Sequence, residues 1–302
     1  ATNATRLILR HLPPEDAQIP YNLVPVIIKS LITNLSASES DQYLDSMAEH
    51  FINDAFKNIL TFFIDSYRIS PQISIALFNE ICRDYPYFNI DNIDKLLTCF
   101  LMSLWTNFIL LTPPDLLPDN PPDVLADLFE LFKSSPYTIV QKVCLKCITK
   151  YACEKTDEIM SFLKFFEKVT QCDHIEVNIR VIALCKFTFL LSVLNQETFE
   201  SQYPFIFQMS ELAKTTEGNM VKLMKHLVRL AIKISELGYE TQFIQYVHQF
   251  IIREVTSGFF MKIKHVVKTL CDIIDDNPAL QTLQQNLLEL RKEEASKDKE
   301  DN

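Results

Sequence analysis

The sequence predicts an all-α protein in which antiparallel helices, about 12 to 14 of them, follow one another in series. Three observations predict this class. Apolar residues recur at helical spacing along most of the chain, whereas the alternation typical of strands is nearly absent. Glycine occurs only three times in 302 residues, which leaves almost no place for the glycine-rich turns of nucleotide-binding folds. Hydrophobic residues make up 48% of the chain and charged residues 23%, so a large core can form.

The first third of the chain carries several helical patterns. Apolar residues between 21 and 35 form one stripe, and two further helices are expected over 39–52 and 54–68. Ser70 and Pro71 begin the next helix as its N-cap and first residue, and Pro86 follows its end. A very apolar helix over 91–111 is expected to be buried on most sides.

A proline-rich segment follows at 112–122, with five prolines between 113 and 122. Proline removes the backbone N–H and clashes with the preceding turn, so this segment is expected to be extended and not helical. It is interpreted as a hinge between acidic helical repeats at 1–111 and further helical repeats at 123–293.

The second half has a more regular pattern, and a charged tail is expected at 294–302. Short connections between its helices require neighbouring helices to run antiparallel. Helix pairs recur at about 35 to 45 residues, which is typical of right-handed α-solenoids of the HEAT or armadillo type; a closed bundle is the alternative. Its helices are predicted over 123–134, 137–153, 156–171, 175–194, 197–213, 217–236, 239–255, 259–275 and 278–293.

Charge is distributed unevenly along the chain. Residues 1–135 contain 8 basic and 17 acidic residues, whereas residues 136–268 contain 17 basic and 13 acidic residues. Two basic stripes lie in the second range: one is Lys142, Lys146 and Lys150, and the other is Lys222, Lys225, Arg229 and Lys233 with His226 beside them. Spacing of three and four residues places each set on one helix face. An acidic peptide, a phosphorylated segment or an anionic membrane surface would suit such a face, but an ordinary solvated face has the same pattern.

Nucleic acid is not an expected partner, because the sequence pI is about 5.1. Aromatic residues are expected on apolar helix faces and not among arginines; examples are Phe162, Phe165, Phe166, Phe187 and Phe189. The eight cysteines are mostly in apolar stretches, and neither a signal peptide nor an apolar run of membrane-spanning length is evident. These features predict a reduced, cytoplasmic location.

Candidate catalytic and metal-binding residues are few. Cys144 and Cys147 form a CxxC pair, but they lie within a helical pattern and no second pair completes a zinc site, so core packing is expected. Cys172 and His174 are close in sequence, but no third group that would orient them can be named. No cofactor, metal or catalytic residue is therefore expected, and an all-α enzyme is the less favoured alternative.

Residues 81–192 resemble the helical trunk of β-type adaptins, the large subunits of clathrin-adaptor coats. The residues that carry this resemblance are Ile81-Cys82-Arg83-Asp84-Tyr85-Pro86, DVLADLFELFKSSPYTIVQKVCLKCITKYACEKTDEIMSFLKFFEKV at 123–169 and EVNIRVIALCKFTFLLS at 176–192. Glu176 and Arg180 are similar to a charged stretch of that family. The resemblance implies a cytosolic coat or trafficking subunit that binds other subunits and membrane-bound cargo.

These observations together predict a non-catalytic scaffold that binds other proteins, such as acidic peptides or subunits of a larger complex. A role in nuclear transport or complex assembly is the alternative within this class. The seven basic residues of the two stripes are the candidate binding residues.

Overall fold

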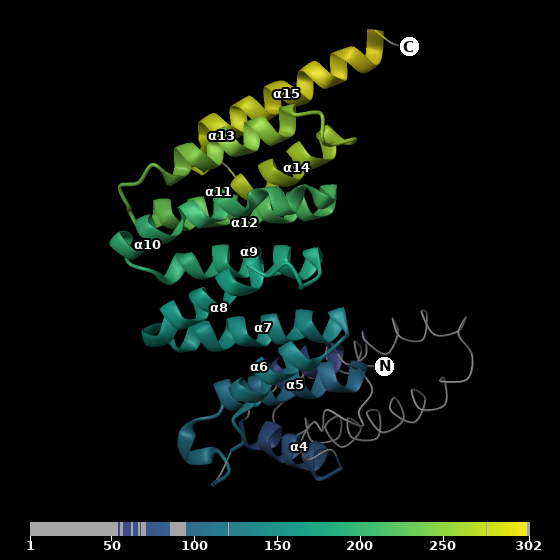
Figure 1. Ribbon diagram of the computed structural model, residues 1–302, viewed down its shortest axis with the longest axis vertical. Helices are drawn as coiled ribbons and strands as arrows, with labels where there is room; N and C mark the ends of the chain where they lie inside the picture. Colours follow the sequence, from purple (N-terminus) through teal and green to yellow (C-terminus); the bar gives the residue numbers. More distant parts are fainter. Residues whose placement is uncertain are drawn as a thin grey trace, which may run out of the picture. The chain divides into compact units, whose positions relative to one another are not determined.

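The computed structural model describes residues 54, 57–61, 63–65, 67, 71–84, 95–119, 121–275 and 277–300 (Figure 1). Every regular element within these ranges is a helix, so the predicted all-α class is confirmed for them. The helices predicted over 21–35 and 39–52 lie outside the described residues. By its internal contacts the chain divides into two compact units, which meet in sequence between Glu154 and Lys155.

The first unit contains helices α4 (Pro71–Asp84), α5 (Lys95–Leu111), α6 (Val124–Ser134) and α7 (Thr138–Glu154). Helix α5 packs against both α6 and α7, which explains its apolar character. Phe78 on α4 stacks on Phe108 of α5 with ring centroids 3.5 Å apart, and the edge of Trp105 meets Phe78. The long apolar helix is thus buried on most sides, as predicted.

The proline-rich segment is not entirely extended. Pro114–Leu116 form a short 3-10 turn, in which the Leu116 N–H donates to the Pro113 carbonyl at 2.9 Å. Proline is tolerated in a first turn because its φ is already near the helical value and its missing N–H has no helical partner there. Asp123 then caps α6 by accepting a hydrogen bond from the Ala126 N–H at 3.1 Å.

The second unit contains eight α-helices within the described residues, and Figure 1 shows them lying side by side in this unit. Helix α9 packs against α8 and α12, α12 also packs against α14, and α14 packs against α15. Helices α9, α12 and α14 are therefore consecutive neighbours, which places their outer faces on one surface. The helices are α8 (Ile159–Gln171), α9 (Val177–Leu190), α10 (Gln196–Gln202), α11 (Pro204–Met209), α12 (Glu217–Glu236), α13 (Phe243–Thr256), α14 (Ile263–Ile274) and α15 (Gln281–Glu300).

The single helix predicted over 197–213 is wrong. The structure has α10, then α11, then a 3-10 turn at Ser210–Thr215. Pro204 begins α11, because its ring cannot continue the preceding helix without a clash. Phe199 on α10 and Phe207 on α11 both pack against Phe243 of α13, so the break allows two short helices to share one aromatic layer.

Polar contacts at its first turn and beyond its last turn hold α12 in place. The Thr216 hydroxyl caps its start by accepting from the Asn219 N–H at 3.1 Å, and the Asn219 amide donates to Asn178 of α9 at 2.8 Å. Beyond its end, the Tyr239 hydroxyl donates to the Leu194 carbonyl at 2.6 Å. These contacts fix the rotation of α12 about its axis and therefore the direction in which its polar face points.

Within the described ranges, no helix combines the length and the apolar character that crossing a membrane requires.

Candidate functional site

The outer face of α12 carries the second basic stripe. Lys222, Arg229 and Lys233 are exposed and Lys225 is half-buried, as their spacing predicts. The opposite face supplies the core, so this orientation is enforced by packing; its buried residues are Met220, Leu223, Met224, Leu227, Val228, Leu230, Ala231 and Ile234. The structure thus places all four basic residues of this stripe along one side of one helix.

Two cavities flank this stripe, and together they are called the basic groove. The first has a volume of about 620 Å³ and lies between α12 and α14. The second, of about 490 Å³, lies between α9 and α12. His226 and Arg229 line both cavities, so the two adjoin at these side chains of α12. The first is lined by Glu217, Gly218, Val221, Lys222, Lys225, His226, Arg229, Lys262, His265 and Val266, and the second by Lys186, Phe189, Ser192, His226, Arg229, Leu230 and Lys233.

The lining of the basic groove is strongly cationic. Six lysine and arginine side chains line it, against the single carboxylate of Glu217, which already accepts the Met261 N–H at 2.8 Å. Lys233 Nζ lies 3.3 Å from a carboxylate oxygen of Glu236. Among the described residues, no carboxylate lies within ion-pair distance of Lys222, Lys225, Arg229 or Lys262. These four side chains give the groove an excess of positive charge, and it attracts anions.

His226 lies at the centre of the groove, where both cavities meet. Burial, together with the positive charges of Lys186, Arg229 and Lys222, lowers its pKa to about 4. At neutral pH the imidazole is therefore uncharged and can donate one hydrogen bond and accept another.

Six residues of the groove lie outside α12, among them Lys186, Phe189, Lys262 and His265, and sequence spacing alone does not identify them. Lys186 and Phe189 lie on α9, Lys262 precedes α14 and His265 lies on its first turn. They meet α12 only because α9, α12 and α14 pack side by side, which no linear motif encodes. Phe189, which is expected on an apolar helix face, is instead 45% exposed and lines a cavity with Lys186, whereas Phe187 on the same helix is buried.

The first basic stripe lies on α7 in the other unit and differs from the second. Lys142 and Lys146 are exposed. Lys150 is half-buried and donates to the Asn107 side-chain oxygen on α5 at 2.6 Å. Burial lowers the pKa of Lys150; Cys147 opposes this, and the charge of Lys146 adds a smaller lowering effect. Lys150 thus contributes to helix packing, which leaves two of the three lysines on the open surface.

Cys144 and Cys147 lie inside α7, as the sequence predicts, and both are buried. Burial raises the pKa of both thiols, so they remain protonated and pack as small apolar groups. Cys172 is half-buried and His174 is exposed, and no hydrogen bond joins them within the described structure. No disulfide is formed by Cys99, Cys144, Cys147, Cys153, Cys172, Cys185 or Cys271, and no three His, Cys, Asp or Glu residues of the described chain converge as metal ligands do.

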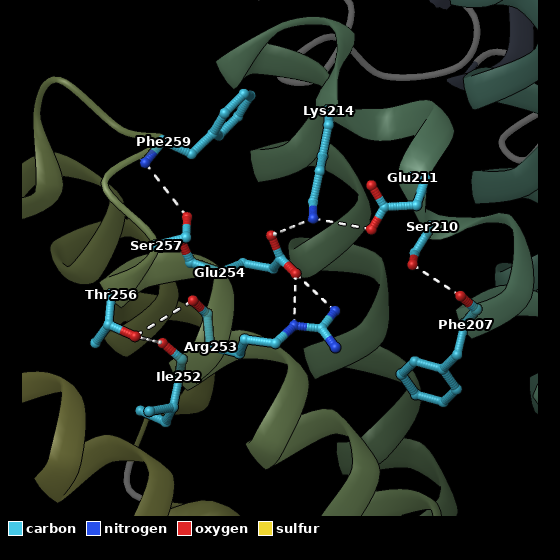
Figure 2. A network of polar contacts seen from close by, with 10 residues as sticks. All are labelled: Phe207, Ser210, Glu211, Lys214, Ile252, Arg253, Glu254, Thr256, Ser257 and Phe259. Carbon is cyan, nitrogen blue, oxygen red and sulfur yellow. Dashed lines mark hydrogen bonds and ion pairs between the residues drawn. The ribbon is translucent and has the colours of Figure 1, made fainter.

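A buried carboxylate, Glu254 of α13, is the centre of a second polar cluster (Figure 2). Its side chain is 1% exposed, and the guanidinium of Arg253 donates to its Oε1 at 2.9 and 2.6 Å. Lys214 Nζ lies 3.4 Å from Oε2 and 2.8 Å from Glu211. Both cations reach the carboxylate, so its charge is matched locally and it serves to fasten α13 to the turn that precedes α12. Sequence spacing gives no signal for this cluster, because Lys214 and Glu254 are far apart in the chain.

The chain matches no protein-family model, no curated protein and no solved structure. The geometry of the groove is therefore the basis for a functional assignment.

Proposed function

We propose that the protein is a non-catalytic scaffold whose basic groove binds an acidic segment of a partner protein. The single observation that carries this proposal is the composition of the groove. Six cationic side chains from three adjacent structural segments line two adjoining cavities, and the one carboxylate among them is already hydrogen-bonded. Complementary charge accelerates encounter and selects acidic partners over basic ones.

We further propose that the helices form a right-handed α-solenoid of the HEAT or armadillo type. The packing order within the second unit supports this, because α9 contacts α8 and α12, and α12 contacts α14. In a solenoid each repeat packs mainly on its neighbours, and one helix of each pair contributes to an extended binding surface. On this proposal, α9, α12 and α14 are the helices that form the binding surface.

A cytoplasmic role as a coat or trafficking adaptor is the proposal that follows from the resemblance of residues 81–192 to β-type adaptins. Arg180, which is part of that resemblance, donates to the Thr170 carbonyl at 2.8 Å and pairs with Asp173 at 2.9 Å. It therefore fixes the turn between α8 and α9. This contact is consistent with a structural role for the charged stretch and leaves partner binding to the groove.

The test compares binding of a labelled glutamate-rich peptide by the natural protein and by a variant in which Lys222, Lys225, Arg229 and Lys233 are all changed to Glu. The matched control is Lys142→Glu with Lys146→Glu, which reverses exposed lysines on α7. We expect the groove variant to lose at least about tenfold in affinity and the control to lose little.

Circular dichroism and thermal unfolding would establish that both variants are folded. Binding that rises at low salt and falls at high salt would support an electrostatic contact. Equal binding by the groove variant and the control would show that the groove is an ordinary solvated surface, and the proposal would fail.

A further inference from the structure

The two cavities of the basic groove differ in chemistry. The cavity between α12 and α14 is lined by Lys222, Lys225, Arg229, Lys262 and two imidazoles. The cavity between α9 and α12 has Phe189 and Leu230 in its lining, with cationic groups beside them. The first suits a highly charged group, and the second suits an apolar side chain close to negative charge.

The first cavity has more positive charge than one carboxylate can balance. Four cations line it, against the one carboxylate of Glu217, and among the described residues none of the four has an ion-pair partner. A carboxylate supplies one negative charge, whereas a phosphorylated side chain supplies about 1.5 to 2 at neutral pH, with three strong acceptor oxygens. Arg229 and the lysines can each donate to such oxygens, and phosphate is the group that uses several of these donors at once.

The second cavity offers an aromatic surface. Phe189 is 45% exposed, which is unusual for a phenylalanine on a helix whose other faces are buried. Lys186 and Phe189 are three residues apart on α9, so an apolar ligand side chain on the ring would lie near positive charge.

The spacing of the cavities fits an extended peptide that crosses the helices. Packed helices lie about 8 to 10 Å apart, so the furrows on the two sides of α12 are separated by a similar distance. A polyproline-II segment rises about 3.1 Å per residue with three residues per turn. Its residues three apart therefore point the same way and are separated by about 9 Å.

We propose that the basic groove is a two-part site for a phosphorylated peptide. The cavity between α12 and α14 binds a phosphoserine or phosphothreonine, and the cavity between α9 and α12 binds an apolar side chain three residues away against Phe189. This inference rests on the proposed function, because it names the class of acidic segment that the same groove binds. A peptide suits the site better than a membrane surface does, because the cationic groups line furrows between helices and a thin chain can enter them.

The experiment measures fluorescence anisotropy of the whole protein with labelled peptides that differ at two positions. One position is phosphoserine, aspartate or serine, and a position three residues away, on either side, is phenylalanine or serine. We expect phosphoserine with phenylalanine to bind at least about tenfold more tightly than aspartate with phenylalanine. Replacing the phenylalanine by serine should weaken binding to the natural protein by about fivefold and should have little effect on a Phe189→Ser variant.

Two variants separate the cavities. Lys262→Gln with His265→Gln should reduce the preference for phosphoserine over aspartate, whereas Lys142→Gln with Lys146→Gln on α7 should leave it unchanged. If aspartate and phosphoserine peptides bind equally well, the groove recognises acidic segments in general: the proposed function stands and the phosphate assignment is wrong. If none of the peptides binds, both are wrong. Binding to vesicles containing anionic phospholipid, without peptide binding, would likewise overturn the phosphopeptide assignment.

Discussion

At the scale of single residues, two side chains, Glu254 and His226, influence the free energy of unfolding through their burial and the charges around them. Glu254 is shielded from water and is paired with Arg253 and Lys214. Breaking a buried ion pair by removing the partners leaves a charge without compensation, which costs more than replacing the whole group by apolar side chains. The cluster in Figure 2 allows this rule to be tested.

We expect the double variant Lys214→Met, Arg253→Met to lose on the order of 3 kcal/mol of unfolding free energy, because the Glu254 carboxylate would be left alone. Adding Glu254→Leu should recover a large part of that loss, since the buried charge is then gone. Urea unfolding measures both. Glu211→Gln is the control, because it removes an exposed carboxylate and leaves both cations beside Glu254; it should cost less than about 0.5 kcal/mol. A triple variant less stable than the double variant would contradict this account.

The second such residue is His226, whose pKa is lowered to about 4 by burial and by Lys186, Arg229 and Lys222. Lys262 and His265, from the α14 side, line the same cavity. The unfolded chain binds a proton at His226 near pH 6.5, whereas the folded chain does so only near pH 4. Stability is therefore lost as the pH falls from 6.5 to 4, by up to about 3 kcal/mol from this residue.

We expect His226→Gln to flatten the fall in unfolding free energy between pH 6.5 and 4, because glutamine takes up no proton. Chemical unfolding at several pH values would measure this difference between the variant and the natural protein. His265→Gln serves as the control, since its side chain is exposed in the same cavity. Parallel pH profiles for His226→Gln and the natural protein would contradict the expectation.

At the scale of helices, the two glycines at the ends of α12 differ in backbone conformation and therefore in how well they tolerate substitution. Gly218 lies in the first turn, where an added Cβ would be 3.9 Å from the nearest side-chain atom. Gly238 follows the last turn with φ of 70°, and its N–H donates to the Ser235 carbonyl at 3.0 Å. Only the second position is a left-handed conformation that side chains disfavour.

Gly238→Ala should therefore destabilise the protein by about 1 kcal/mol, because alanine is strained at positive φ. Gly218→Ala is the matched control on the same helix and should be neutral or stabilising by up to about 1 kcal/mol, since it favours the helix over the unfolded chain. Thermal unfolding of the two variants tests this. Equal effects of the two substitutions would show that the backbone conformation at 238 is not what matters.

Helix ends could be predicted where local chemistry sets them. The predicted helix 217–236 coincides with α12, because Thr216 caps its start and Gly238 follows its end. Helix α14 begins at Ile263 and not near 259 as predicted, because the preceding residues make tertiary contacts: Phe260 is buried and the Met261 N–H donates to Glu217. Apolar periodicity extends the predicted helix through such residues, although their apolar side chains here belong to a loop that packs on the core.

The residues of the candidate site likewise fall into two groups: those that sequence spacing predicts and those that depend on tertiary packing. The basic stripe of α12 follows from spacing within one helix, so the sequence predicts which side chains share a face. Lys186 and Lys262 join it only through helix packing, and that depends on contacts between residues far apart in the chain, such as Asn178 with Asn219. The same limit applies to Lys150, which the stripe pattern placed with Lys146 but which contacts Asn107 on another helix.

At the scale of the whole molecule, every residue of the basic groove belongs to the second unit, 155–302. This unit has its own aromatic and aliphatic core, which includes Phe199, Phe243 and Leu227. We expect a fragment of residues 155–302 to fold and to bind the glutamate-rich peptide with an affinity within about threefold of the whole chain's, since surface charges distant from the groove are screened by salt. Circular dichroism and anisotropy measure the two properties. A folded fragment that does not bind would show that the first unit supplies part of the site.

The close spacing of Lys222, Lys225 and Arg229 along α12 lowers the stability of the unliganded protein. Like charges three and four residues apart on a helix repel one another by about 0.2 to 0.5 kcal/mol per pair, and here no carboxylate of the described chain lies close enough to offset that repulsion. At these positions, a substitution that stabilises the unliganded protein therefore weakens its binding of an anion. A neutral residue at 225 should raise the melting temperature of the free protein while weakening binding, so selection for stability alone would remove this stripe. Under the proposed function, binding of an anionic partner offsets this loss of stability.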